Sequence, residues 1–200
     1  MNRHVNRGRS QVASRIGTRG LCVIATVVLC GAPSSATAQK SDVAGGYGYA
    51  AIRHEFDWKN YQGFWLGTSL YVRPQLGIVG EFDRLSWSLT YNASESETHR
   101  RYGYLGGVKF TSRRDRSASG FVQALAGVAQ DHTTLMTGFG TELSASTFAI
   151  QFGGGGDVHL TRAVSVRTAG DVRINGPQHS TDWHFPEWRL QAGVVYAFQR

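Results

Sequence analysis

This sequence has few cysteines and, after its first 38 residues, only a small excess of basic over acidic residues. The two cysteines, Cys22 and Cys30, both fall in the first 38 residues, so loss of that segment leaves no disulfide, no thiol nucleophile and no thiolate metal ligand. The formal charge of +7 includes five arginines of the same segment, which leaves +2 on the rest, with basic and acidic residues interleaved. A nucleic-acid-binding protein keeps a one-sided basic surface, so that class is excluded.

A long apolar run is also missing. The apolar stretch from Leu21 to about Ala32 is well short of the roughly 20 residues that a membrane-spanning helix needs. It follows an arginine-rich segment without acids and precedes Ala36-Thr37-Ala38, the small-x-small pattern that signal peptidase accepts. We therefore predict that residues 1–38 are a cleaved signal peptide. The alternatives are an uncleaved anchor, disfavoured by its length, and a lipoprotein signal at Cys30, disfavoured by the bulky residue before it.

Residues 39–200 make one domain, and their hydrophobic pattern has the two-residue period of β-strands. In Trp188–Phe198 every even position is apolar and the odd positions are mostly polar or small. The same alternation recurs in 64–73, 102–111, 147–157 and 164–174. Phe121–Gln130 is mixed, and Leu76–Leu89 changes phase near Arg84, where we expect a bulge. With Val43–Ile52 as the first, this gives eight strands.

The connections between these strands alternate in length. We expect long ones near Arg53–Gln62, Thr90–Arg100, Asp131–Ala145 and Asn175–Pro186, and short ones near Arg73–Gln75, Ser112–Ala118 and Leu160–Arg162. Four long loops at one rim and three turns at the other are typical of an outer-membrane barrel with both termini at the periplasmic side. The sequence therefore predicts an all-β fold, a closed antiparallel up-and-down transmembrane β-barrel of about eight strands.

Charge and aromatic residues favour this barrel over a soluble sandwich. The strand charges lie opposite the apolar face, so a lipid-embedded barrel would enclose them: Arg73, Glu81, Asp83, Lys109, Asp157, Arg167, Asp171, Arg173 and Arg189. Threading the strands up and down gathers aromatic residues at both rims, as in interfacial girdles. The long-loop girdle contains Trp65, Trp87, Tyr102 and Trp188, and the short-turn girdle contains Tyr71, Phe110, Phe121, Tyr196 and Phe198.

The enclosed charges also predict the state of the lumen. Among them are both acids and bases in nearly equal number, and unpaired charges in a confined space are costly. A barrel of eight strands is only just wide enough for its interior side chains to fill it. We therefore expect a salt-bridged plug rather than an open pore.

Two stretches resemble a known family. Ser146–Ile174 is similar to the penultimate hairpin, and Arg189–Phe198 to the last strand, of the small outer-membrane β-barrels that include the opacity-protein and outer-membrane protein A-like barrels. The last strand also matches the C-terminal assembly signal of such proteins, at Gln191, Gly193, Tyr196 and Phe198. The resemblance implies a bacterial outer-membrane location and insertion by the barrel assembly machinery. It implies no single activity, because members of the family differ in their loops.

Catalytic, cofactor and metal sites are not expected. The glycine run Gly153–Gly156 is not followed by the lysine of a phosphate-binding loop, and Asn92-Ala93-Ser94 is better explained as a polar loop than as a glycosylation acceptor. No two histidines share a strand face at metal-ligand spacing. The mature-chain histidines, which fall mostly in the predicted loops, are His54, His99, His132, His159, His179 and His184.

One enzymatic alternative remains open in the last long loop. His179, Ser180, Asp182 and Glu187 are residue types of a serine hydrolase, and lipid A deacylases are outer-membrane barrels of similar size. Adjacent residues of an extended chain point in opposite directions, so His179 cannot easily activate Ser180. A narrow channel is a further alternative, against which the balanced lumen charge weighs.

Our interpretation is a non-enzymatic, monomeric outer-membrane barrel that serves envelope structure or surface interaction through its extracellular loops. Its partners would be outer-membrane lipid, the assembly machinery and an extracellular ligand that the sequence does not identify, with no nucleic acid among them.

Overall fold

The structure, a computed structural model, describes residues 41–54, 57–92, 95–112, 117–136, 141–176 and 186–198. The predicted signal peptide lies outside these residues, and so do His179, Ser180 and Asp182 of the enzymatic alternative. Within the described ranges no helix is long and apolar enough to cross a membrane.

The described residues form a closed antiparallel β-barrel in which each strand pairs with its neighbours along the chain and the last strand pairs with the first. The strands are β1 (Ser41–His54), β2 (Asp57–Tyr71), β3 (Leu76–Asn92), β4 (Glu95–Thr111), β5 (Ala118–Met136), β6 (Thr141–His159), β7 (Val164–Asn175) and β8 (Glu187–Phe198). This confirms the predicted up-and-down barrel and its number of strands.

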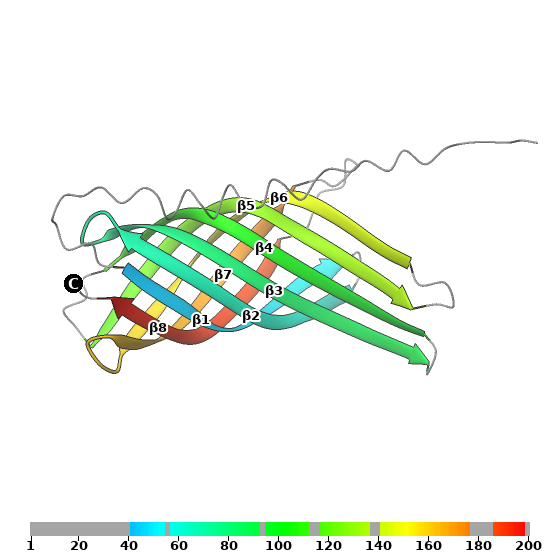
Figure 1. Cartoon of the computed structure of the whole chain (residues 1–200), viewed down its shortest axis with the longest axis horizontal. Helices are drawn as coiled ribbons and strands as arrows, with labels where there is room; N and C mark the ends of the chain where they lie inside the picture. Colours follow the sequence, from blue (N-terminus) through cyan, green and yellow to red (C-terminus); the bar gives the residue numbers. More distant parts are fainter. Residues whose placement is uncertain are drawn as a thin grey trace, which may run out of the picture. The chain divides into compact units, whose positions relative to one another are not determined.

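The two rims of the barrel differ. The chain enters β1 and leaves β8 at the rim that carries the β2–β3, β4–β5 and β6–β7 connections (Figure 1). Two of these connections are tight turns, closed by hydrogen bonds from the Val72 amide to the Leu76 carbonyl and from the Leu160 amide to the Val164 carbonyl, both 3.0 Å long. Short turns on the side of both termini are the arrangement predicted for the periplasmic rim.

At the other rim, the strands are much longer than predicted. β3 and β4 have 17 residues each and β5 and β6 have 19, whereas about 9–11 residues of a tilted strand cross a bilayer. These four strands project beyond the rest of the barrel (Figure 1). Three of the predicted long loops, 53–62, 90–100 and 131–145, are therefore wrong. They are mostly paired strands, in register to His54–Asp57, Asn92–Glu95 and Leu135–Thr141.

The predicted bulge near Arg84 is also wrong. The register of β3 against β4 is regular there and shifts only between Thr90 and Asn92. From Leu76 to Leu89 of β3, odd residues face the lumen and even residues face outward, so Leu85 is buried while Arg84 is exposed. The sequence pattern inverts because the surroundings change: above this level the outer face meets water instead of hydrocarbon. Polar residues then become compatible with the outside and apolar ones with the inside.

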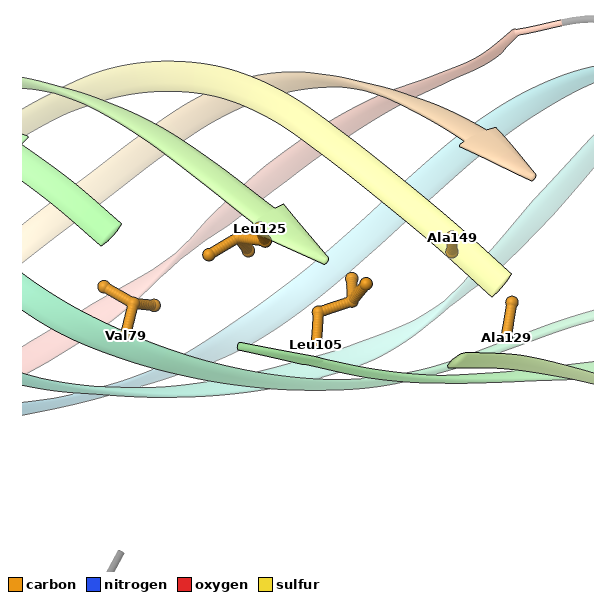
Figure 2. Close-up of a cluster of buried hydrophobic side chains, with 5 residues drawn as sticks. All are labelled: Val79, Leu105, Leu125, Ala129 and Ala149. Carbon is orange, nitrogen blue, oxygen red and sulfur yellow. The ribbon is translucent and has the colours of Figure 1, made fainter. Parts of the chain in front are cut away.

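Polarity across the barrel wall is the reverse of that of a soluble protein. Leu190 is 63% exposed and Phe148 58% exposed on the outer wall, while Lys109 and Arg173 are completely buried inside. A small apolar cluster also lies in the lumen, formed by Val79, Leu105, Leu125, Ala129 and Ala149 (Figure 2). Apolar side chains outward and charges inward are the pattern required of strands that face lipid.

The predicted aromatic girdles are only partly correct. Tyr102, Trp188, Phe110, Tyr196 and Phe198 point outward as expected. Four others point into the lumen, namely Trp65, Trp87, Tyr71 and Phe121. Each of these four has an odd number on its strand, so the alternation itself placed them inside, and their aromatic character does not override it.

Candidate functional site

Charged side chains from opposite walls of the barrel meet at mid-height in the lumen. The guanidinium of Arg173 on β7 donates to the carboxylate of Asp83 on β3 at 2.5 and 3.3 Å, and both side chains are fully buried. Arg189 on β8 also pairs with Asp83, with 3.2 Å between Nη2 and Oδ2. Because β3 lies far from β7 and β8 in the strand order, these contacts cross the lumen.

Gln151 and Glu81 extend this cluster through further hydrogen bonds to its arginines. The Gln151 amide oxygen accepts hydrogen bonds from Arg173 at 2.8 and 3.0 Å and from Arg189 at 2.5 Å. The Glu81 carboxylate accepts from Gln151 at 3.0 Å, from Gln191 at 3.1 Å and from Arg189 at 3.2 Å. Charge-assisted hydrogen bonds of this kind offset the cost of burying charge, and here they form one network across the lumen.

A second ionic cluster lies toward the long-strand rim. Arg101 on β4 makes a two-point contact with Asp131 on β5, at 2.5 and 3.1 Å, and donates to Glu187 on β8 at 2.8 Å. Its guanidinium also lies 5.7 Å from the ring centroid of Tyr61. The sequence analysis missed this cluster, because it assigned Arg101, Asp131 and Glu187 to loops or their borders rather than to strands.

A third cluster lies toward the short-turn rim. Arg167 makes a two-point contact with Asp157 at 2.7 and 2.9 Å. Arg167 and Lys109 lie 4.7 and 4.4 Å from the ring centroid of Phe121, within the range of cation–π attraction. The predicted enclosure of Lys109, Asp157 and Arg167 is thus confirmed. The enclosure of Arg73 is wrong, because Arg73 is exposed in the turn between β2 and β3.

Histidine, carboxylate and hydroxyl side chains meet above the second cluster. His99 on β4 contacts Glu97 at 2.7 Å through Nε2 and Thr133 on β5 at 3.0 Å through Nδ1. These are the residue types of a hydrolase triad. The contacts also follow directly from the register, since Glu97 and His99 share one face of β4 and Thr133 is the cross-strand partner of His99. The alternation Glu-x-His would have revealed this group had the segment been predicted as a strand.

A second histidine with hydrogen-bond contacts is His159. Its two ring nitrogens contact Ser119 at 3.1 Å and Ser165 at 2.7 Å near the short-turn rim. Among the residues that the structure describes, no group of histidine, cysteine and acidic side chains could hold a metal ion.

A groove runs over the outside of β4, β5 and β6 at the level where these strands leave the apolar band. It has a volume of about 340 Å³. Its lining comes from the outward-facing even positions of the three strands, namely Arg100, Tyr102, Tyr104, Gln130, His132, Thr134 and Glu142. Polar, aromatic and cationic groups therefore converge on the outer wall, and Arg100, His132, Thr134 and Glu142 among them come from segments predicted as loops.

The residues of the predicted assembly signal occupy both faces of β8. Gln191 and Gly193 point into the lumen, and Tyr196 and Phe198 point outward. The two aromatic rings contact each other edge to face, with 5.0 Å between centroids. The signal thus supplies both a hydrogen bond to Glu81 and an exposed aromatic pair at the periplasmic end of the strand.

No protein-family model matches this sequence, and no curated protein sequence matches it. Its fold does match solved structures. The crystal structure of Ail, the attachment invasion locus protein of Yersinia pestis, in complex with the heparin analogue sucrose octasulfate superposes with a TM-score of 0.63 at 16% identity, covering 81% of this chain and 100% of Ail. Neisserial surface protein A superposes with a TM-score of 0.61 at 12% identity, covering 79% of this chain and 97% of that protein. The outer membrane protein OprG from Pseudomonas aeruginosa superposes with a TM-score of 0.50 at 9% identity, covering 82% of this chain and 97% of OprG.

At these identities the similarity concerns the fold. The chain has the fold of the small outer-membrane barrels, as the resemblance of its last strands implied. With the apolar outer wall and the ionic interior, this fold places the protein in a bacterial outer membrane.

Proposed function

We propose that this protein is a non-enzymatic, monomeric outer-membrane barrel, closed to ions, that acts by presenting the projecting part of β3–β6 as a binding surface outside the cell. The observation that carries the proposal is the length of these strands. A strand needs only about 9–11 residues to cross the membrane, so the additional residues do not serve the span. Their regular pairing gives a stiff, twisted sheet rather than mobile loops.

The lumen supports the closed state. Three ionic clusters are stacked along it. In the first two, arginines and acids pair across the barrel, and in the third Arg167 pairs with Asp157 on the adjacent strand. A hydrated channel would leave such groups in contact with water instead of with one another. The clusters therefore favour a structural role for the interior over conduction.

The enzymatic alternative has less support. The contacts that join Glu97, His99 and Thr133 are explained by strand register. Catalysis by an activated hydroxyl also needs a place for the reacting carbonyl and donors for its oxyanion. A lipid A deacylase-like role thus remains the second candidate.

Assembly is proposed to depend on the end of β8. Tyr196 and Phe198 form an exposed aromatic pair on the strand that closes the barrel against β1, and a machinery that inserts barrels must recognise such a strand before closure. The proposed partners are therefore outer-membrane lipid, the barrel assembly machinery and an extracellular ligand.

The test uses surface labelling of single cysteines. Ser88→Cys on β3 and Ser144→Cys on β6 introduce thiols at exposed outward positions of the projecting strands, and Arg162→Cys introduces one at the opposite rim. A membrane-impermeant maleimide should label the first two on intact cells and the third only after permeabilisation. Labelling of Arg162→Cys on intact cells, with the other two protected, would reverse the orientation and remove the proposed binding surface.

Heparin is a suitable first probe of ligand binding, since the solved structure of Ail contains a heparin analogue. Cells carrying this chain should retain more heparin than cells without it, because Arg84 and Arg100 are exposed on this side of the barrel. Dextran serves as the uncharged control. Equal retention would exclude sulfated glycans as the ligand of this surface.

A further inference from the structure

The outer wall of the barrel carries two parallel rows of side chains, one aromatic and one basic. The aromatic row runs across three strands, with ring centroids 5.9 Å apart from Phe64 to Phe82 and 5.2 Å apart from Phe82 to Tyr104. Aromatic side chains concentrate where hydrocarbon meets headgroups. The row therefore marks the outer boundary of the apolar band on this side of the barrel.

The basic row lies one outward-facing position farther along β3 and β4, at Arg84 and Tyr102, and continues to His132 on β5. The Arg84 guanidinium lies 5.9 Å from the ring centroid of Tyr102. Tyr102 in turn contacts the ring of His132 edge to face, with 5.6 Å between centroids. A cation, a phenol and an imidazole are thus held together directly beyond the aromatic boundary.

The groove on β4–β6 opens beside this row. Arg100, Tyr102 and His132 line it together with the hydrogen-bonding side chains of Gln130 and Thr134. These groups lie on adjacent strands because Tyr102 pairs with Gln130 and Arg100 with His132 in the register of β4 and β5. The groove can offer several donors at once to a compact anion.

Charge in the groove favours an anion. Arg84 and Arg100 are both exposed, and among the described acidic residues none forms an ion pair with either of them. The carboxylate in the lining belongs to Glu142 on β6, which is the cross-strand partner of Thr134 on β5. Strand β5 therefore lies between Glu142 and Arg100 on β4. Arg100 thus lines the groove and Arg84 lies against Tyr102 beside it, and neither forms an ion pair with an acidic residue of the described ranges.

We propose that this groove, together with the Arg84 that lies against its Tyr102, binds the phosphate of an anionic lipid headgroup in the outer leaflet. Arg84 and Arg100 would supply charge-assisted donors to the phosphate oxygens, which guanidinium groups match well. The hydroxyl of Tyr102 and the amide of Gln130 would complete the set, and the acyl chains would lie along Phe82 and Tyr104. The inference depends on the orientation of the barrel in the membrane and not on the surface-binding role proposed above.

The experiment measures lipid retained by the folded full-length protein in dodecyl maltoside, by native mass spectrometry. The probes are bisphosphorylated lipid A and monophosphoryl lipid A. The wild type should retain the bisphosphorylated form more strongly. Arg84→Gln with Arg100→Gln should weaken its binding about thirtyfold, because each cation near an anionic lipid contributes roughly a factor of five.

Two variants serve as matched controls. Arg73→Gln with Arg162→Gln removes the same charge from exposed turns at the opposite rim and should leave binding unchanged. Arg84→Lys with Arg100→Lys keeps the charge and should retain most of the affinity. A shift in gel mobility on boiling verifies that every variant is folded.

Three results would overturn the proposal. One is equal retention of lipid A by the wild type and the Arg84→Gln, Arg100→Gln variant. Another is displacement of bound lipid A by inorganic phosphate at equimolar concentration, which would show a site for free phosphate. The third is a variant that loses binding to heparin but not to lipid A, which would assign the arginines to a soluble polyanion.

Discussion

Arg173 and Asp83 form a two-point ion pair across the centre of the barrel, with neither side chain exposed to solvent. The pair joins β7 to β3, and Arg189 on β8 shares the same carboxylate. The walls of the barrel are therefore connected through its interior as well as around its circumference.

Removal of one partner of this pair should destabilise the barrel strongly. Arg173→Met leaves the Asp83 carboxylate with one of its two arginines, and breaking a buried pair costs about 3–5 kcal/mol. Urea unfolding in detergent micelles, followed by the boiling-sensitive gel shift, measures the loss. The double variant Asp83→Leu, Arg173→Met should recover much of it, since no unpaired charge remains. A single variant that unfolds like the wild type would show that the pair contributes nothing.

The folded protein should conduct no steady current in planar bilayers. Arg173, Arg189 and Glu81 are joined across the lumen by hydrogen bonds to Gln151, and the other two ionic clusters place further charged side chains in the lumen. A boiling-sensitive gel shift of the same preparation shows that the protein in the bilayer experiment is folded. Reproducible ohmic steps from that preparation would contradict the plug.

Gly46 should be essential for closing the barrel. A Cβ added at Gly46 would overlap the backbone of Ala192 and Gly193 on β8, and the pairing of β1 with β8 is what closes the sheet. Gly46→Ala should therefore lower the yield of the heat-modifiable form and the stability of what does fold, by about 1–3 kcal/mol. Gly106→Ala is the control, because its nearest contact would be an ordinary 3.8 Å.

Lipid A should be chemically unchanged by this protein. We expect identical lipid A mass spectra from cells that carry the wild type, His99→Ala, Thr133→Ala and His179→Ala. The reason is that the contacts of His99 follow from strand pairing and His179 cannot readily reach the hydroxyl beside it in an extended chain. Loss of an acyl chain in the wild type that disappears in any of these variants would favour the enzymatic alternative.

The alternation of apolar and polar residues predicted a strand well where its outer face meets only hydrocarbon and its inner face meets only the lumen. In β8, Leu190, Val194 and Phe198 meet hydrocarbon and Arg189 and Gln191 meet the lumen, so one period describes the whole strand. This is why the barrel, the number of strands and most of the enclosed charges were predictable.

Prediction failed where a strand passes from one medium into another. Arg84 and Leu85 keep the orientation of the strand while the water outside inverts the preferred residue types. In a single sequence, such an exchange of apolar and polar positions looks the same as the phase shift that a β-bulge produces. For the same reason the projecting parts of β3–β6 looked like loops, and the cluster of Arg101, Asp131 and Glu187 was not foreseen.

The outer groove could not be predicted from the sequence for a different reason. Arg84, Arg100 and His132 are far apart or on different strands, and only the register of β3, β4 and β5 brings them together. Register depends on turn geometry and on packing, neither of which alternation specifies.

The pairing of β1 with β8 has a consequence for biogenesis. The strand that closes the sheet against β1 also carries Arg189, which pairs with Glu81 and shares Asp83 with Arg173. A truncated chain that lacks β8 could not close the sheet and would also leave Glu81 without this arginine. Closure of the wall and completion of the charge network therefore depend on one and the same strand.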